Sequence, residues 1–206
     1  SGTAVLVARG VRLAERRQRL VALIEHMDDG IVRVLDTLEA TGLAKNTIVV
    51  FAADSGVARG SHGLIGKQNL YEHSMRVPLI ISGPGIPAGQ RSSAMCYLFD
   101  VLPTLGKICR ISAPAASEGI DFGATLSDPA KPARDQMMFA YKKVMRAIRD
   151  DRWKLIRYPM VDRNHLFDLL ADPNETTNLA DKPENAAKVS ELMAKLEKQQ
   201  QLFADP

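Results

Sequence analysis

The chain has 206 residues, of which 46% are hydrophobic and 25% are charged, the balance of a globular protein with enough length for one ordinary domain and its core. Basic residues outnumber acidic ones by 27 − 24 = 3, and no aromatic pattern or recognition motif supports a nucleic-acid partner. No apolar run approaches the roughly 18 residues of a transmembrane helix, so we expect no membrane partner, and the start lacks the layout of a signal peptide. An arginine cluster near the start is typical of a solvated helix face: Arg9, Arg12, Arg16, Arg17 and Arg19.

The first structured segment predicted is a helix over residues 11–40. Gly42 follows its last periodic residue and suits a left-handed cap at the helix end. Residues 47–51 are β-branched and continuously apolar, which predicts a strand buried on both faces, as in a parallel sheet covered by helices. The helix over residues 11–40 is predicted because apolar residues recur at steps of three and four: Leu20, Ile24, Met27, Ile31, Val34, Leu35 and Leu38.

A polar, glycine-rich loop over residues 54–74 follows this predicted strand. Ligands of α/β proteins bind at loops that leave the carboxyl ends of buried strands, so the loop is a candidate binding site. A second apolar strand is predicted over residues 77–81, ending at Gly83-Pro84-Gly85, and a short helix over residues 100–109. The two cysteines, Cys96 and Cys109, form neither a CxxC pair nor a disulfide framework, and we expect buried free thiols.

The character of the sequence changes after about residue 113. A loop to about residue 134 precedes three short strands, at residues 137–141, 144–149 and 153–158, which predict a small antiparallel sheet. Pro183 begins a final helix. Its apolar stripe consists of Val189, Leu192, Met193 and Leu196.

Asp54 is the first candidate site residue, because a carboxylate at the exit of a buried strand can hold a hard cation. Lys67 and His62 lie in the same loop and could bind an anionic ester beside that cation. Taken one at a time, these residues fit ordinary roles equally well: a turn-forming aspartate, a surface lysine and a loop histidine.

Read together, these segments resemble the sulfatase family, which is arylsulfatase-like and part of the alkaline phosphatase superfamily. The resemblance covers about residues 20–200, and it rests on the joint order of its motifs. The site segments are Ile48-Val-Val-Phe-Ala-Ala-Asp54-Ser-Gly56, Gly60-Ser-His62-Gly-Leu-Ile-Gly-Lys67, Tyr71-Glu72 and Arg76-Val-Pro-Leu-Ile. The flanking segments are Met27-Asp-Asp-Gly-Ile, Asp100-Val-Leu-Pro-Thr-Leu105, Trp153-Lys-Leu-Ile-Arg-Tyr158, Leu166-Phe-Asp-Leu169 and Asp172-Pro-Asn-Glu-Thr-Thr-Asn-Leu179.

The resemblance implies an α/β fold: part of an alkaline-phosphatase-like sheet flanked by helices, then a small antiparallel sheet with a C-terminal helix. Residues 1–113 would belong to the catalytic α/β domain and residues 114–206 would form a small C-terminal α+β subdomain. Asp54 matches the metal-binding aspartate of the family, which usually holds calcium, while Ser55 stands where the family has Asn or His. Lys67 matches the sulfate-binding lysine, and His62 has a weaker match to a substrate-side position. Glu72 and Arg76 match the motif as structural residues that could pair.

The family's nucleophile is a formylglycine made from the Cys or Ser of Cys/Ser-x-Pro-x-Arg, and no cysteine or serine of this chain stands in that motif. We therefore expect the C-terminal portion of a sulfatase that is inactive alone and binds calcium weakly or not at all. Its partners would be a sulfate ester and the missing N-terminal half, with self-association through exposed apolar surface. By resemblance, the parent enzyme would be periplasmic or secreted.

Two other functions remain open at this point. The chain could belong to a phosphonate or phosphodiester hydrolase of the same superfamily, which shares the Asp, His and Lys pattern. Alternatively, it could be a non-catalytic sulfatase-like binding protein, a reading that Ser55 at a ligand position favours.

Overall fold

The computed structural model describes residues 2–205, with side chains from residue 18 onward. It divides into two compact units, one of residues 1–49 with 82–85 and the other of residues 50–81 with 86–206. The domain boundary expected near residue 113 stays a prediction. Within the described residues, none of the helices combines the length and the apolar character needed to cross a membrane.

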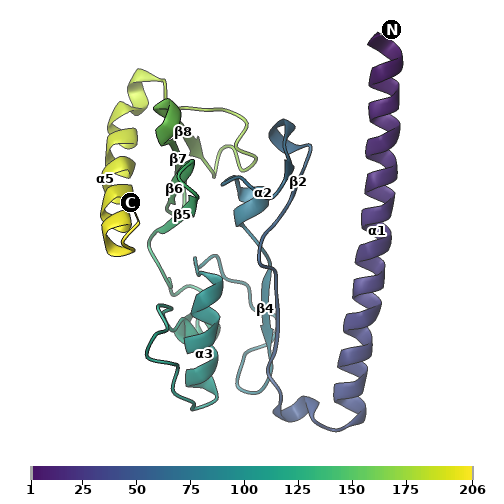
Figure 1. Ribbon diagram of the computed structural model, residues 1–206. Coiled ribbons are helices and arrows are strands. Elements are labelled where there is room, and N and C mark those ends of the chain that lie inside the picture. The colour runs from purple at the N-terminus through teal and green to yellow at the C-terminus, as the bar shows by residue number, and fades with distance from the viewer. Residues whose placement is uncertain (1, 206) are drawn as a thin grey trace. The chain divides into compact units, whose positions relative to one another are not determined.

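The first unit is dominated by α1 (Gly2–Ala40), the long helix drawn in purple in Figure 1. Its end confirms the predicted cap: Gly42 has φ of 72°, its N–H bonds the carbonyl of Glu39, and the N–H of Leu43 bonds that of Leu38. Much of its predicted apolar stripe is exposed, with Ile24 at 50% and Met27 at 51%. Four arginines of the predicted basic face, at positions 9, 12, 16 and 17, lie outside the described side chains, and Arg19 is exposed.

The two apolar strands of the first half pair with each other as β1 (Val49–Ala52) and β4 (Leu79–Ser82). The prediction that residues 47–51 form a strand buried on both faces is wrong, since Phe51 is exposed; Ile80 of β4 is exposed as well. A continuously apolar strand is buried only when strands flank both its edges and helices cover its faces. In the described chain this sheet has only β1 and β4.

The glycine-rich loop folds into a small hairpin. Its two short strands pair antiparallel, with Arg59 opposite Ile65. The elements of this segment are β2 (Ala58–Arg59), η2 (Ser61–Gly63), β3 (Ile65–Gly66) and α2 (Glu72–Met75).

Between β4 and β5, the short helix predicted over residues 100–109 is present as η3 (Leu98–Asp100) followed by α3 (Val101–Ile108). The loop expected to run to about residue 134 contains one more short helix, α4 (Gly123–Ser127). The expectation of buried thiols is wrong for Cys109, which is exposed where α3 ends. Cys96 is half-buried, and burial raises the pKa of its thiol.

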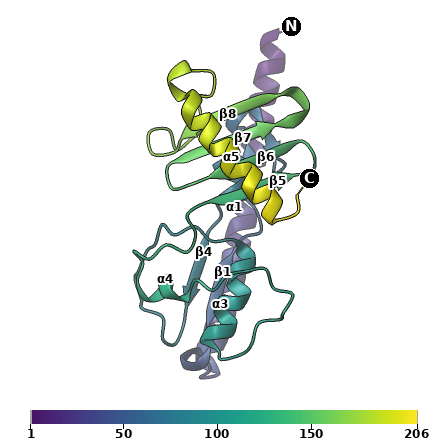
Figure 2. The same ribbon diagram turned by 90° about the vertical axis from the view of Figure 1, so that its left-hand side faces the viewer.

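The second half contains a four-stranded antiparallel sheet in the order β5-β6-β7-β8. The three predicted strands are confirmed, and a fourth joins them next to the third. The final helix lies across the sheet (Figure 2). The elements are β5 (Met137–Tyr141), β6 (Met145–Arg149), β7 (Trp153–Tyr158), β8 (Arg163–Asp168), η5 (Pro183–Asn185) and α5 (Ala186–Leu202).

Each face of this sheet packs against a different partner, because side chains alternate along a strand. On one face Ile148 and Leu155 pack in one cluster with Leu192 and Leu196, which confirms the predicted stripe of α5. On the other face Ile156 belongs to a cluster with residues that precede α2 and lie within it: Leu70, Tyr71 and Met75. The end of the glycine-rich segment therefore packs against the C-terminal sheet.

Candidate functional site

Asp54 and Lys67 lie together, as the sequence predicts. Lys67 Nζ is 3.3 Å from Asp54 Oδ2, and Ser55 Oγ donates to Asp54 Oδ1 at 3.5 Å. Asp54 follows β1 and Lys67 follows β3, so the two ends of the glycine-rich loop meet through this pair. The hydrogen bond and the charge of Lys67 hold the pKa of Asp54 below its ordinary value. Both side chains face open solvent, with exposed fractions of 80% for Asp54 and 55% for Lys67.

Gly56 is the residue that brings this loop against α2. Its N–H donates to the carbonyl of Ser74 at 2.9 Å. A Cβ at this position would lie 2.0 Å from the carbonyl oxygen of His73, a distance that no side chain tolerates. The Asp-Ser-Gly motif is therefore explained locally: glycine permits the close approach, and Asp54 precedes it by two residues.

His62 contacts a different set of residues from Lys67. Its ring stacks on Tyr71 with centroids 3.9 Å apart, and its Nε2 lies 2.9 Å from the backbone carbonyl oxygen of Glu175. The structure thus brings Asp54, Ser55 and Lys67 together, whereas His62, at the tip of the hairpin, contacts Tyr71 and the backbone of Glu175.

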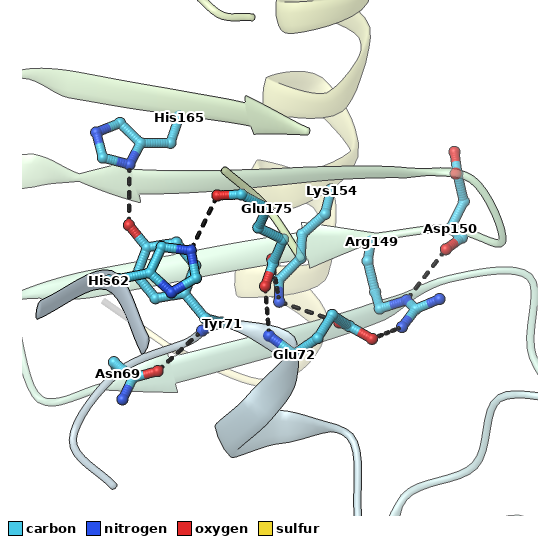
Figure 3. Close-up of polar contacts among 9 residues, drawn as sticks. All are labelled: His62, Asn69, Tyr71, Glu72, Arg149, Asp150, Lys154, His165 and Glu175. Carbon is cyan, nitrogen blue, oxygen red and sulfur yellow. Dashed lines mark hydrogen bonds and ion pairs between the residues drawn. The ribbon is translucent and has the colours of Figure 1, made fainter. Parts of the chain in front are cut away.

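Beside His62 lies a buried network of charges that includes Glu175 (Figure 3). The fully buried ammonium of Lys154 is 3.1 Å from Glu72 Oε1 and 2.9 Å from Glu175 Oε1, the latter an ion pair without hydrogen-bond geometry. Arg149 bonds the other oxygen of Glu72 at 2.6 Å. The backbone N–H of Glu72 donates to Glu175 Oε2 at 2.6 Å. Opposite charges balance, which a buried ionic cluster requires.

The prediction that Glu72 pairs with Arg76 is wrong, because the charges that reach Glu72 come from the C-terminal sheet. One feature of the sequence indicated a buried lysine on this sheet. Lys154 and Ile156 are two residues apart on β7, so both side chains lie on the same face, which is a core face. Glu175 gave no such signal, since a glutamate in a polar turn normally faces water.

A pocket of about 520 Å³ opens beside this network. It is lined by His62 but by neither Asp54 nor Lys67. Within it, His73 Nε2 is buried and has no hydrogen-bond partner among the residues with described side chains, and burial lowers the pKa of that ring. The lining residues are Ser61, His62, Glu72, His73, Pro173, Asn174, Glu175 and Thr176.

Oxygen donors for a metal are few at the candidate site. Among the residues with described side chains, no cluster of three or more His, Cys, Asp or Glu side chains could hold a metal ion. Asp54 and Ser55 supply oxygens of the kind that calcium prefers, but calcium takes six to eight ligands. The donor type fits calcium, and the number of donors does not complete its coordination.

The charge of Glu72 predicts a loss of stability in acid. Burial raises its pKa, but attraction to Lys154 and Arg149 outweighs burial and holds the pKa below 4.5. The unfolded chain then binds protons more readily than the folded one, so the free energy of unfolding should fall as the pH drops below about 4.5. Urea titrations over a pH series measure this slope. Glu72→Gln should have a shallower slope, and equal slopes would contradict the assignment.

Two family models match the chain. One, described as N-sulphoglucosamine sulphohydrolase, C-terminal, matches residues 60–202, and the other, Sulfatase, matches residues 8–110. An N-acetylglucosamine-6-O-sulfatase of Bacteroides thetaiotaomicron is 34% identical over 90% of this chain and 36% of its own length. The chain therefore spans about a third of that relative.

Solved structures agree with these matches. A structure in complex with its substrate, D-glucosamine-2-N,6-O-disulfate, superposes with a TM-score of 0.80 at 33% identity, covering 86% of this chain and 39% of that one. A phosphonate monoester hydrolase from Silicibacter pomeroyi superposes at 0.74 with 25% identity, covering 84% and 38%. These neighbours have the α/β fold of the alkaline phosphatase superfamily. With a family model over most of its length and a 34% identical relative over 90% of it, the chain belongs to the sulfatase family.

Proposed function

We propose that this chain is the C-terminal portion of a hydrolase that cleaves sulfate esters. The observation that carries the proposal is the pairing of Lys67 with Asp54 at the exit of β1, 3.3 Å apart and open to solvent. The ammonium of Lys67 would bind sulfate oxygens, and His62 would contact the ester from the same hairpin. A cation fixed beside the sulfate favours cleavage because negative charge develops as the ester oxygen departs.

Calcium would be held by Asp54, with Ser55 as a second and weaker donor. Its other ligands would have to come from outside the described residues, so calcium binding by this chain alone is expected to be weak. A bound calcium ion would supply electrostatic stabilisation of the sulfate charge. Lys67 would then be released from Asp54 toward the sulfate group.

The nucleophile of the proposed reaction is a formylglycine supplied from outside this sequence, since no Cys/Ser-x-Pro-x-Arg motif is present in it. Without a nucleophile, the electrostatic groups have no attack on sulfur to assist. We therefore expect the 206-residue chain to release no p-nitrophenol from p-nitrophenyl sulfate in the presence of calcium. Turnover that scales with protein concentration would contradict this expectation.

The binding role of Lys67 can be tested without turnover. We expect sulfate to slow acetylation of Lys67, measured by mass spectrometry against chloride at equal ionic strength. Lys107 is a matched control, because it also pairs with an aspartate, Asp121 at 2.7 Å, and is 76% exposed. Equal slowing at both lysines would show ordinary screening and would remove the basis for the sulfate site.

The phosphonate monoester hydrolase structure supports a second candidate, hydrolysis of phosphonate or phosphate diesters on the same scaffold. The same acetylation assay separates the two, since a sulfatase site should be protected better by sulfate than by methylphosphonate. A non-catalytic binding protein, the reading that Ser55 favours, should bind the anion yet stay inactive when the missing N-terminal half is added.

Two further proposals concern the setting of the chain. The missing N-terminal half is the expected partner, and the exposed apolar residues of α1 would promote self-association in its absence. Light scattering would show species larger than a monomer if this is correct. The parent enzyme is proposed to be periplasmic or secreted.

A further inference from the structure

Two strained residues meet at a single hydrogen bond. His62 has φ of 55° and Glu175 has φ of 56°, a left-handed conformation that is uncommon for residues other than glycine. The ring of the first and the backbone carbonyl of the second are joined at 2.9 Å. Strained conformations persist only where the surroundings enforce them, and they cluster at functional sites.

The left-handed backbone conformation of Glu175 is held in place by its buried side chain. Only 2% of the residue is exposed, and its carboxylate is held by Lys154 and by the backbone N–H of Glu72. The turn around it is closed by Asp172, whose carboxylate accepts from the N–H of Thr177 at 2.8 Å and from the hydroxyl of Thr176 at 3.1 Å. The carbonyl of Glu175 therefore points in a direction set by the interior of the C-terminal sheet.

The bond also determines how His62 can act. A carbonyl oxygen can only accept, so Nε2 must carry the proton, and Nδ1 is the nitrogen left for another partner. The stack on Tyr71 fixes the plane of the ring. His62 is thereby held in one tautomer and one orientation.

His62 lies inside the hairpin that ends at Lys67. The hairpin is closed around it by the N–H of Gly60, which bonds the carbonyl of Leu64 at 2.9 Å, and β3 then leads directly to Lys67. We propose that Glu175, held by Lys154, is a positioning residue that orients His62 and, through this hairpin, Lys67. The link to sulfate binding rests on the proposed function; the orientation of His62 does not.

The test compares two substitutions of Glu175. Glu175→Gly permits the left-handed backbone but removes the side chain, whereas Glu175→Gln keeps an acceptor for the N–H of Glu72. The readout is the Nε2–H proton of His62 in nuclear magnetic resonance, because a hydrogen-bonded ring proton exchanges slowly with water. We expect exchange to quicken about fivefold or more in Glu175→Gly, the factor of one lost hydrogen bond, and much less in Glu175→Gln.

Arg110→Gly is the matched control, since Arg110 is also a left-handed residue, with φ of 59° at the end of α3. It should leave the His62 proton unchanged. If Glu175→Gly fails to fold, Asp172→Ala opens the turn without touching the buried charges and should quicken exchange as well. Unchanged exchange in folded Glu175→Gly, or in Asp172→Ala when it is the variant used, would overturn the proposal.

Acetylation of Lys67 in the same variants separates this inference from the proposed function. Loss of the sulfate protection of Lys67 in Glu175→Gly, with protection retained in Arg110→Gly, supports both. If the wild-type chain shows no sulfate protection while the His62 proton still depends on Glu175, the positioning role stands and the sulfate site is wrong.

Discussion

Replacing Lys154 with methionine is expected to lower the free energy of unfolding by about 3–5 kcal/mol, the usual cost of removing one partner from a buried ion pair. Lys154 is fully buried and is the only cation within an ion-pair distance of Glu175 among the described residues. Methionine fills similar space but leaves Glu175 without a cation, while Glu72 keeps Arg149. Urea unfolding followed by circular dichroism measures the loss.

The matched control is Lys107→Met, because Lys107 pairs with Asp121 at the surface, where water screens the charge. It should change stability little. The loss in Lys154→Met should also shrink as the pH falls, since Lys154 holds the pKa of Glu72 below its ordinary value and a protonated Glu72 needs no buried cation. A Lys154→Met variant as stable as Lys107→Met would mean that the network adds nothing to stability.

Replacing Gly56 with alanine is expected to cost about 1–3 kcal/mol, the range of overpacking, and to move the Asp54 loop away from α2. The added Cβ would lie 2.0 Å from the oxygen of His73 and 3.2 Å from the Cα of Ser74, and both are backbone atoms that cannot rotate aside. The bond between Gly56 N–H and the carbonyl of Ser74 should break as a result. Thermal unfolding measures the cost, and hydrogen exchange of the Gly56 amide measures the movement.

Gly30→Ala serves as the control for this substitution. Gly30 lies inside α1, where a Cβ meets nothing nearer than Arg33 at 4.0 Å, so alanine should stabilise the helix by up to about 1 kcal/mol. Opposite signs for the two variants are the expected result. A Gly56→Ala variant that keeps both its stability and its amide protection would show that the loop adapts without cost.

Local patterns predicted the elements that depend on neighbours in sequence. The sequence located β5, β6 and β7 as short strands of a small antiparallel sheet, and the stripe of Leu192 and Leu196 predicted the face of α5 that packs on the sheet. Gly42 marked the end of α1 for a purely local reason, the left-handed backbone that a helix cap requires. The order of motifs along the loop predicted that Asp54 and Lys67 meet.

Patterns failed where burial depends on residues distant in sequence. An apolar strand such as β1 looks buried in any sequence, but its exposure is set by the strands and helices that flank it. Likewise, Cys109 follows an apolar helix and still faces solvent. The partner of Glu72 could not be read from its motif, because Lys154 and Arg149 lie about eighty residues further along the chain.

By itself the sequence determined the family, three of the four strands of the C-terminal sheet, the final helix that packs on them, and the proximity of Asp54 and Lys67. Only the tertiary structure decided that His62 rests on Glu175 and that a buried lysine connects this turn to the site hairpin. The physical reason is the distance along the sequence over which each feature is determined. Helix caps and short strands depend on backbone geometry over a few residues. A buried charge is tolerated only where the fold brings its counter-charges together.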